Sequence, residues 1–182
     1  MRLKLFILVL ALQMAWVLYT VATQEHALAA GRAVMLETQR IDPRDPLRGD
    51  YLILNYKISA VPTNLFSPPV KMDLPEGTKI FVALKPGTNQ FFVVSRASTN
   101  AFAPVAGEVL LRGKSRPEWW WNTTNSIRVE YGLERYYVAE GTGSPAGKLT
   151  VRAIISASGS AHIKEVFING KPYAEVMKPG GS

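Results

Sequence analysis

Cysteine is absent from this chain of 182 residues, and histidine occurs only twice. The lack of cysteine excludes a disulfide framework, a thiolate metal site and a cysteine nucleophile. The two histidines, His26 and His162, lie far apart in the sequence and lack the spacing of a Ser-His-Asp triad or a metal-ligand set. The sequence therefore predicts neither a metal nor a cofactor, and it names no reaction.

The chain also lacks a basic stripe, although its formal net charge is +7. Its lysines and arginines are scattered along the sequence, whereas a nucleic-acid-binding surface needs them clustered on one face. Glycine-rich phosphate loops of the strand-to-helix type are missing as well. We expect a solvated basic surface and no nucleic-acid partner.

One long hydrophobic run is present, at the N-terminus. Residues 5–22 read LFILVLALQMAWVLYTVA, with only Gln13 and Thr20 as polar interruptions. At about 1.5 Å per residue a helix of this run covers roughly 27 Å, close to the hydrocarbon thickness of a bilayer. The sequence predicts a transmembrane helix over residues 5–22, with the lipid bilayer as its partner.

Charges on either side of this run predict its orientation. Arg2 and Lys4 precede it and Glu25 follows it. Because cations favour the cytoplasmic side, residues 1–4 are expected to form a cytoplasmic n-region and the remainder to lie across the membrane.

A cleaved signal peptide is the alternative to a permanent anchor. Ala27, Leu28 and Ala29 satisfy a small-x-small cleavage site, so cleavage would follow Ala29. The apolar run is longer than the usual signal core, however, and residues 23–32 can continue the helix as a juxtamembrane extension. An uncleaved signal anchor is favoured, and the body is exported in either case.

Beyond the anchor, polar and apolar residues alternate with the period of half-buried strands. Strands are expected at residues 33–39, 50–59, 79–85, 90–96, 108–114, 127–131, 135–139, 149–156 and 162–168. Two hairpins are predicted, one turning at Pro86-Gly87 and one at Ser158-Gly159.

No amphipathic helix of three turns follows about residue 38. The predicted fold class is therefore all-β, an antiparallel barrel or sandwich, preceded by one N-terminal transmembrane helix. The extracytoplasmic β domain is expected over residues 33–178, with a flexible tail at 179–182.

Two segments do not fit the strand pattern. Residues 61–78 hold four of the 12 prolines and are expected to form an irregular crossover, because proline cannot donate to a β ladder. Residues 116–125 contain Trp119, Trp120 and Trp121, which cannot all face one side of a strand. Packing over the end of the barrel and an aromatic interaction patch, for a partner, a saccharide or the membrane interface, both remain open.

Residues 42–50, DPRDPLRGD, concentrate charge immediately before an apolar strand. The charged residues are Asp42, Arg44, Asp45, Arg48 and Asp50. Each of the two prolines keeps the aspartate before it out of the α region, so carboxylate and guanidinium groups can pair and fix a corner. After this corner Leu52, Leu54 and Tyr56 share one face of the strand, and we expect this face to be buried.

Gly49-Asp50-Tyr51, Leu54 and Tyr56 resemble the signature of the GDYXXLXY family. The similarity extends upstream through Asp42-Pro43-Arg44-Asp45 and Arg48, and downstream to YGLERYYVAEG at residues 131–141. The resemblance implies a single-pass envelope protein of the bacterial inner (plasma) membrane, with its C-terminal domain periplasmic or otherwise extracytoplasmic. It further implies a polytopic membrane protein as partner, and it supplies no catalytic residue.

The downstream block places Glu134 and Arg135 next to each other. Adjacent residues on a strand point to opposite faces, so each needs a partner elsewhere. We expect one polar cluster that also includes Tyr51. In this cluster Glu134 or Glu140 meets Arg44 or Arg48, and Arg135 meets Asp42, Asp45 or Asp50. Such a cluster is interpreted as a structural lock first, then as a binding groove, and last as an active site.

The predicted function is a protein-interaction or accessory module of an envelope membrane complex, without enzymatic activity. The alternative is a peptidase-like or glycosidase-like envelope hydrolase that uses the Asp/Arg corner and Glu134. A signal-peptidase-type enzyme needs a serine soon after its anchor, and residues 23–58 contain none. The candidate nucleophiles that remain, such as Ser95 or Ser115, have no flanking signature.

Overall fold

The computed structural model describes residues 2–39, 51–71, 74–116, 125–138 and 147–177. The helical elements are α1 (Arg2–Ala29), the 3-10 turns η1 (Lys57–Ser59) and η2 (Thr63–Leu65), and α2 (Tyr173–Val176). The strands are β1 (Arg32–Glu37), β2 (Tyr51–Ile53), β3 (Ala60–Pro62), β4 (Lys79–Pro86), β5 (Phe92–Ser98), β6 (Val109–Ser115), β7 (Ser126–Glu130), β8 (Arg135–Tyr137), β9 (Leu149–Ile155), β10 (Ala161–Ile168) and β11 (Lys171–Pro172). Except at residues 50–59, each predicted strand lies within about two residues of an observed one, the usual uncertainty of element ends.

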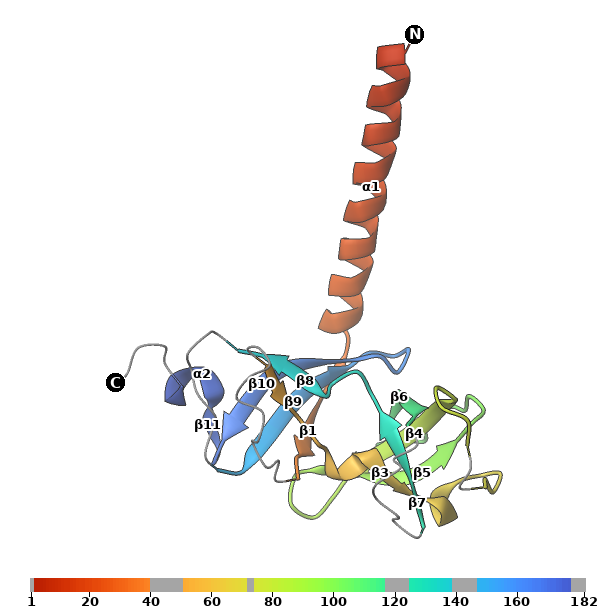
Figure 1. The fold of residues 1–182 in the computed structure, drawn as a ribbon, viewed down its shortest axis with the longest axis vertical. Helices are drawn as coiled ribbons and strands as arrows, with labels where there is room; N and C mark the ends of the chain where they lie inside the picture. The colour runs from red at the N-terminus through yellow and green to blue at the C-terminus, as the bar shows by residue number, and fades with distance from the viewer. Residues whose placement is uncertain (1, 40–50, 72–73, 117–124, 139–146, 178–182) are drawn as a thin grey trace.

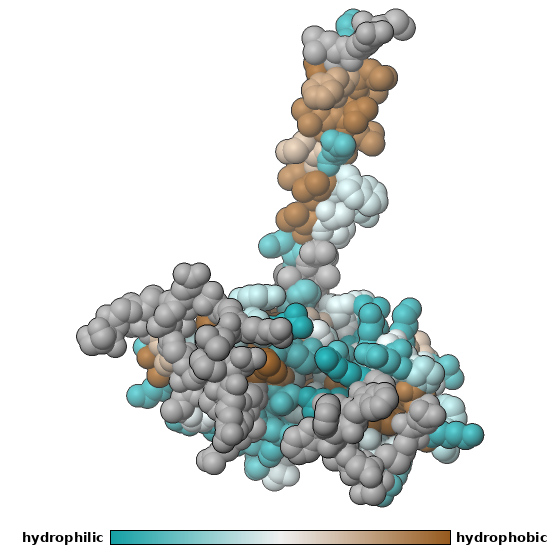
Figure 2. Space-filling model, in the orientation of Figure 1, coloured by the Kyte–Doolittle hydropathy of each residue, from teal (hydrophilic) through white to brown (hydrophobic). Residues whose placement is uncertain are grey.

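Helix α1 projects from the body and is not packed against it (Figure 1). Its segment Lys4–Thr23 has 20 residues with a mean hydropathy of 2.2, and none of it is buried. Figure 2 shows the apolar surface of this helix standing above a body of mixed polarity. At a rise of about 1.5 Å per residue the segment is roughly 30 Å long, so it is long and apolar enough to cross a bilayer once.

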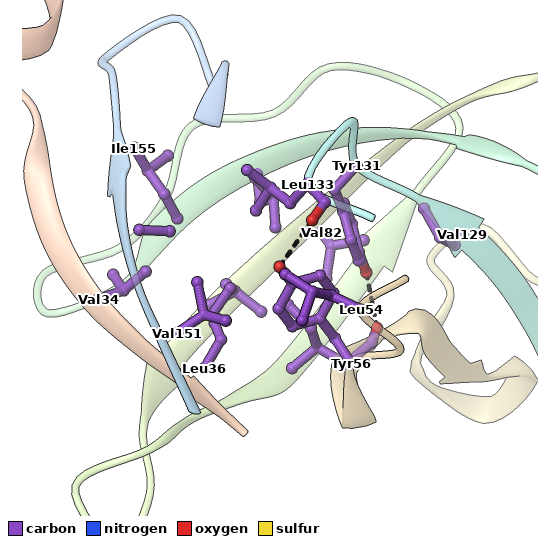
Figure 3. Packing of buried hydrophobic residues seen from close by; sticks show 14 of the residues in the cluster. Val34, Leu36, Leu54, Tyr56, Val82, Val129, Tyr131, Leu133, Val151 and Ile155 are labelled. Atoms are coloured by element: carbon purple, nitrogen blue, oxygen red, sulfur yellow. Dashed lines mark hydrogen bonds between the residues drawn. The ribbon is translucent and has the colours of Figure 1, made fainter. Parts of the chain in front are cut away.

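The described part of the body consists of three antiparallel sheets, which confirms the all-β prediction. Their strand orders are β1-β9-β10-β11, β2-β8 and β3-β7-β6-β4-β5. Strand β4 lies between β5 and β6, and apolar residues such as Ile80, Val82 and Leu84 along it are fully buried. The sheets surround one hydrophobic core, and Figure 3 shows side chains from several strands converging there.

Two contacts between sheets nearly close a barrel. At one seam the residue after β1, Thr38, forms a β-bridge with Tyr56. At another seam the backbone N–H of Arg112 on β6 donates a hydrogen bond of 2.9 Å to the carbonyl oxygen of Gly159, in the turn between β9 and β10. The two alternatives left open by the sequence therefore resolve to a barrel-like arrangement.

Both predicted hairpins are confirmed. Strands β4 and β5 pair around a turn closed by a 2.8 Å hydrogen bond from the Gly87 N–H to the Phe91 carbonyl oxygen. Strands β9 and β10 pair around a turn in which the Ser156 N–H donates to the Ser160 carbonyl oxygen at 2.8 Å. Gly159 in that turn has a φ of 82°, a conformation that glycine adopts without steric strain.

The single strand predicted at residues 50–59 is wrong. Strand β2 ends at Ile53, and the following Leu54 N–H donates to the Glu134 carbonyl oxygen at 2.8 Å. Tyr56 then bridges Thr38, and η1 and β3 follow. The segment thus pairs first with β8 through β2, then with Thr38 after β1 through Tyr56, and then with β7 through β3. A local sequence pattern cannot reveal these changes of partner. Residues 61–71 and 74–78 are mostly irregular, as expected, apart from the end of β3 and η2.

Candidate functional site

The structure covers part of the predicted polar cluster. Tyr51, Glu134 and Arg135 are among the described residues. The other members of the cluster, Asp42, Arg44, Asp45, Arg48, Asp50 and Glu140, and the aromatic patch Trp119, Trp120 and Trp121 lie outside the described residues. The charge pairs proposed between the two sequence blocks therefore stay predictions.

The described parts of the two sequence blocks lie side by side as strands β2 and β8. They pair antiparallel, with Tyr51 opposite Tyr137, Leu52 opposite Tyr136 and Ile53 opposite Arg135. Leu52 and Tyr136 pack against the core. The side chains of the other two pairs point to the opposite face because successive strand residues alternate.

Leu54 and Tyr56 form the buried half of the first block, as predicted. Their exposed fractions are 0% and 1%. The Tyr56 hydroxyl donates a 2.7 Å hydrogen bond to the carbonyl oxygen of Leu133, which Figure 3 shows as a dashed line. In return, the Tyr131 hydroxyl donates to the Ile58 carbonyl oxygen at 2.7 Å. These two bonds join the blocks inside the core.

Burial raises the pKa of both Tyr56 and Tyr131, and the negative charge of Glu134 raises each pKa further. Both hydroxyls therefore stay protonated at physiological pH and act as hydrogen-bond donors. A buried phenol with a satisfied donor stabilises a core, since the unpaired hydroxyl would cost free energy.

Glu134 closes the turn between β7 and β8. Its Oε1 accepts a 2.6 Å hydrogen bond from the backbone N–H of Tyr131, three residues earlier. Its carbonyl oxygen accepts the N–H of Leu54. Gly132 within the turn has a φ of 80°, which a side chain would strain. In the described part of the chain, Glu134 thus fixes the main chain of the second block against the first.

Arg135 lies on the outer face of the β2-β8 pair. Its Cζ is 5.7 Å from the centroid of the Tyr51 ring, within the range of a cation–π contact. The Tyr51 and Tyr137 rings are 6.1 Å apart at an angle of 56°. We call the residues Tyr51, Ile53, Arg135 and Tyr137 the outer ribbon face. Glu134 and Arg135 consequently do not pair with each other.

Comparison with known proteins matches the GDYXXLXY protein family over residues 13–166, most of the chain. The chain belongs to the GDYXXLXY family. No curated protein and no solved structure matched it. Within this member of the GDYXXLXY family, the Leu and the second Tyr of the signature serve the core, whereas the first Tyr, Tyr51, lies on the outer ribbon face.

Sequence reasoning missed two ionic clusters in this GDYXXLXY protein. Glu37 at the end of β1 accepts Lys57 Nζ at 2.7 Å and Lys148 Nζ at 2.5 Å. Hydrogen bonds from Lys148 and then Lys57 lower the Glu37 pKa below its ordinary value. The two lysines are remote from Glu37 in the sequence, so no local signal points to this cluster.

The second missed cluster surrounds Glu108. Its carboxylate accepts the Ser95 hydroxyl at 2.6 Å, the Val105 N–H at 3.1 Å and Arg96 at 3.0 Å. Burial raises the pKa of Glu108, but these hydrogen bonds outweigh burial and the pKa lies below its ordinary value. The guanidinium group of Arg96 also lies 4.5 Å from the ring centroid of Phe102. The cluster ties the connection between β5 and β6 to both strands.

The candidate nucleophiles of the GDYXXLXY chain have structural partners. Ser95 Oγ donates to Glu108, as described above. Ser115 is buried, donates to the Pro75 carbonyl oxygen and accepts the Thr78 N–H. Among the described residues, no group of three or more acidic, histidine or cysteine side chains is placed to hold a metal ion.

Proposed function

We propose that this GDYXXLXY protein is a single-pass protein of the bacterial inner (plasma) membrane whose β domain lies on the periplasmic or extracytoplasmic side. Helix α1 supports this proposal, because an unburied apolar segment of 20 residues needs lipid or a partner around it. Arg2 and Lys4 before the segment and Glu25 after it favour a cytoplasmic N-terminus.

We propose that this helix is an uncleaved signal anchor rather than a cleaved signal peptide, and the continuity of the helix is consistent with this proposal. α1 continues without interruption from Arg2 to Ala29, through the small-x-small sequence at 27–29. Strand β1 begins three residues later, at Arg32. Its pairing with β9 therefore lies close to the end of the helix and leaves a short connection.

The β domain is proposed to act through protein contacts, as an accessory module of an envelope membrane complex with a polytopic membrane partner. The observation that supports this role is the use made of the signature. Leu54 and Tyr56 are buried, and Tyr56 and Glu134 bond to the main chain of the opposite block. These groups hold a scaffold together and leave the outer surface to make contacts.

Two experiments test the proposal. A reporter enzyme that is active only outside the cytoplasm, fused to the C-terminus, should be active, whereas the same fusion with residues 2–23 deleted should be inactive. Photocrosslinkers placed at exposed body positions in native membranes should capture a polytopic membrane protein in a reproducible product. An active deletion fusion would overturn the anchor, and the absence of any protein product would overturn the partner.

A further inference from the structure

The first tyrosine of the family signature is not explained by the core. Tyr51 lies on the outer ribbon face with Ile53, Arg135 and Tyr137. Tyr137 is 74% exposed and Ile53 is 49% exposed, and the two residues lie on neighbouring strands. The outer ribbon face thus presents two phenol rings, one aliphatic side chain and one cation.

The position of the ribbon relates this face to the membrane anchor. Figure 1 shows β8 at the end of the body nearest to α1, at about the level of the turn between β9 and β10. Leu52 and Tyr136 on the inner side of the ribbon pack on the core. The outer ribbon face, on the opposite side of the ribbon, therefore points away from the core.

The length of α1 brings this end of the body to the lipid headgroups. The membrane-spanning segment ends at Thr23 and the helix ends at Ala29, six residues later. At 1.5 Å per residue these six residues add about 9 Å, comparable to the thickness of one headgroup layer. Side chains that project from the helix end of the body therefore reach the outer part of that layer.

The chemistry of the outer ribbon face suits this layer. Tyrosine is enriched at membrane–water interfaces because its ring is apolar and its hydroxyl is polar. Transfer of an aliphatic side chain such as Ile53 from water into this layer is favourable in free energy. A guanidinium group binds phosphate through paired donors, and cations near an anionic surface are attracted to it.

We propose that the outer ribbon face, Tyr51, Ile53, Arg135 and Tyr137, docks on the lipid headgroups of the membrane that α1 spans. This inference rests on the proposed membrane anchor. It assigns Tyr51 of the signature to membrane contact and holds the β domain in one orientation on the bilayer. A protein partner on the same face is the competing outcome of the test.

The absence of cysteine makes the test direct, because a single introduced cysteine carries the only label. The full chain is reconstituted in vesicles of three parts phosphatidylcholine to one part phosphatidylglycerol that contain headgroup-nitroxide lipids. A polarity-sensitive dye is attached to Ile53→Cys, to Val93→Cys or to Tyr19→Cys. Val93 is a matched control, since it is a β-branched strand residue with 42% exposure on β5, which belongs to a different sheet from the outer ribbon face.

The dye at residue 53 is expected to lose most of its fluorescence to the nitroxide, and the dye at residue 93 to keep its own. Quenching at residue 19 but equal, weak quenching at 53 and 93 overturns the docking and leaves the anchor intact. No quenching at residue 19 overturns the anchor itself. Shielding at residue 53 that occurs in native membranes but not in these vesicles assigns the face to a protein and overturns the lipid proposal.

Two further variants separate docking from mere proximity to the bilayer. In the Ile53→Cys background, Tyr137→Ser should reduce the quenching at residue 53, and Tyr137→Trp should restore it. Arg135→Gln should remove the gain in quenching that phosphatidylglycerol gives over phosphatidylcholine alone. Unchanged quenching in both Tyr137→Ser and Arg135→Gln overturns the proposal, with retained far-UV circular dichroism as the check that each variant is folded.

Discussion

The Tyr56 hydroxyl and the Leu133 carbonyl oxygen, 77 positions apart in the chain, are joined by a 2.7 Å hydrogen bond inside the core. The neighbouring bond from Tyr131 to Ile58 runs in the opposite direction between the same two segments. Each segment thus supplies one donor and one acceptor. Together the bonds fix the register in which the family signature meets the second block.

Removing the Tyr56 hydroxyl tests this arrangement. Tyr56→Phe leaves the Leu133 carbonyl oxygen buried without this donor, and we expect a loss of about 1–3 kcal/mol in the free energy of unfolding. Tyr131→Phe should have an effect of similar size through Ile58. Urea denaturation of the full chain in detergent, followed by far-UV circular dichroism, measures both. Tyr137→Phe on the exposed face is the control and should stay within about 0.5 kcal/mol.

A neighbouring pair of residues tests which face of the first block is buried. Leu54 is fully buried, whereas Ile53 beside it is 49% exposed. Leu54→Ala should cost about 2–5 kcal/mol, because it removes buried methyl groups and leaves a cavity. Ile53→Ala should cost much less. The same denaturation experiment compares them, and equal losses at the two positions would contradict the observed register.

Alternation of residue type was enough to predict most strands and the buried face at Leu54 and Tyr56, because burial follows a period of two. It also predicted that Glu134 and Arg135 do not serve each other. Alternation could not predict which residues Glu134 and Arg135 contact. The partner of Arg135 among the described residues, the Tyr51 ring, follows from the β2-β8 register, and register is a tertiary property.

The same limit explains the ionic clusters. Glu37, Lys57 and Lys148 lie on three separate segments that meet only when the barrel forms. Nothing near Glu37 in the sequence marks it as a carboxylate with two cationic partners.

The charged corner at residues 42–50, which the sequence does mark, remains a prediction, because its residues lie outside those described. Charge-neutral variants at Asp50 and Arg135 separate a structural lock, which would unfold, from a binding groove, which would stay folded.

Two glycines with the same backbone conformation test the seam of the barrel. Gly159 and Gly77 have φ values of 82° and 78°. Alanine at either position would be held in a left-handed backbone conformation, which costs about 1–2 kcal/mol. A Cβ at Gly77 meets no atom within 4 Å, but at Gly159 it would lie 2.8 Å from Arg112 Cγ and 3.3 Å from the Leu110 carbonyl oxygen.

Gly159→Ala is therefore expected to destabilise the protein more than Gly77→Ala, by about 1–3 kcal/mol for the overpacked contact. Hydrogen exchange at the Arg112 amide, which bonds the Gly159 carbonyl oxygen, should accelerate only in Gly159→Ala. If the two variants lost equal stability and the Arg112 amide stayed protected in both, the turn would not form the seam described here.

The last prediction concerns pH. Hydrogen bonds from Lys148 and Lys57 lower the pKa of Glu37 from its ordinary value of 4.5 in the folded chain. A carboxyl with a lowered folded pKa contributes stability that is complete above the unfolded pKa and is lost as the pH falls through the folded pKa. Acidification below about pH 4.5 should therefore reduce the free energy of unfolding less steeply in Glu37→Gln than in the unmodified protein. Lys148→Met, which removes the partner with the largest effect on this pKa, should flatten the same part of the curve. Urea denaturation across this pH range measures all three, and parallel curves would show that the two ion pairs contribute nothing to stability.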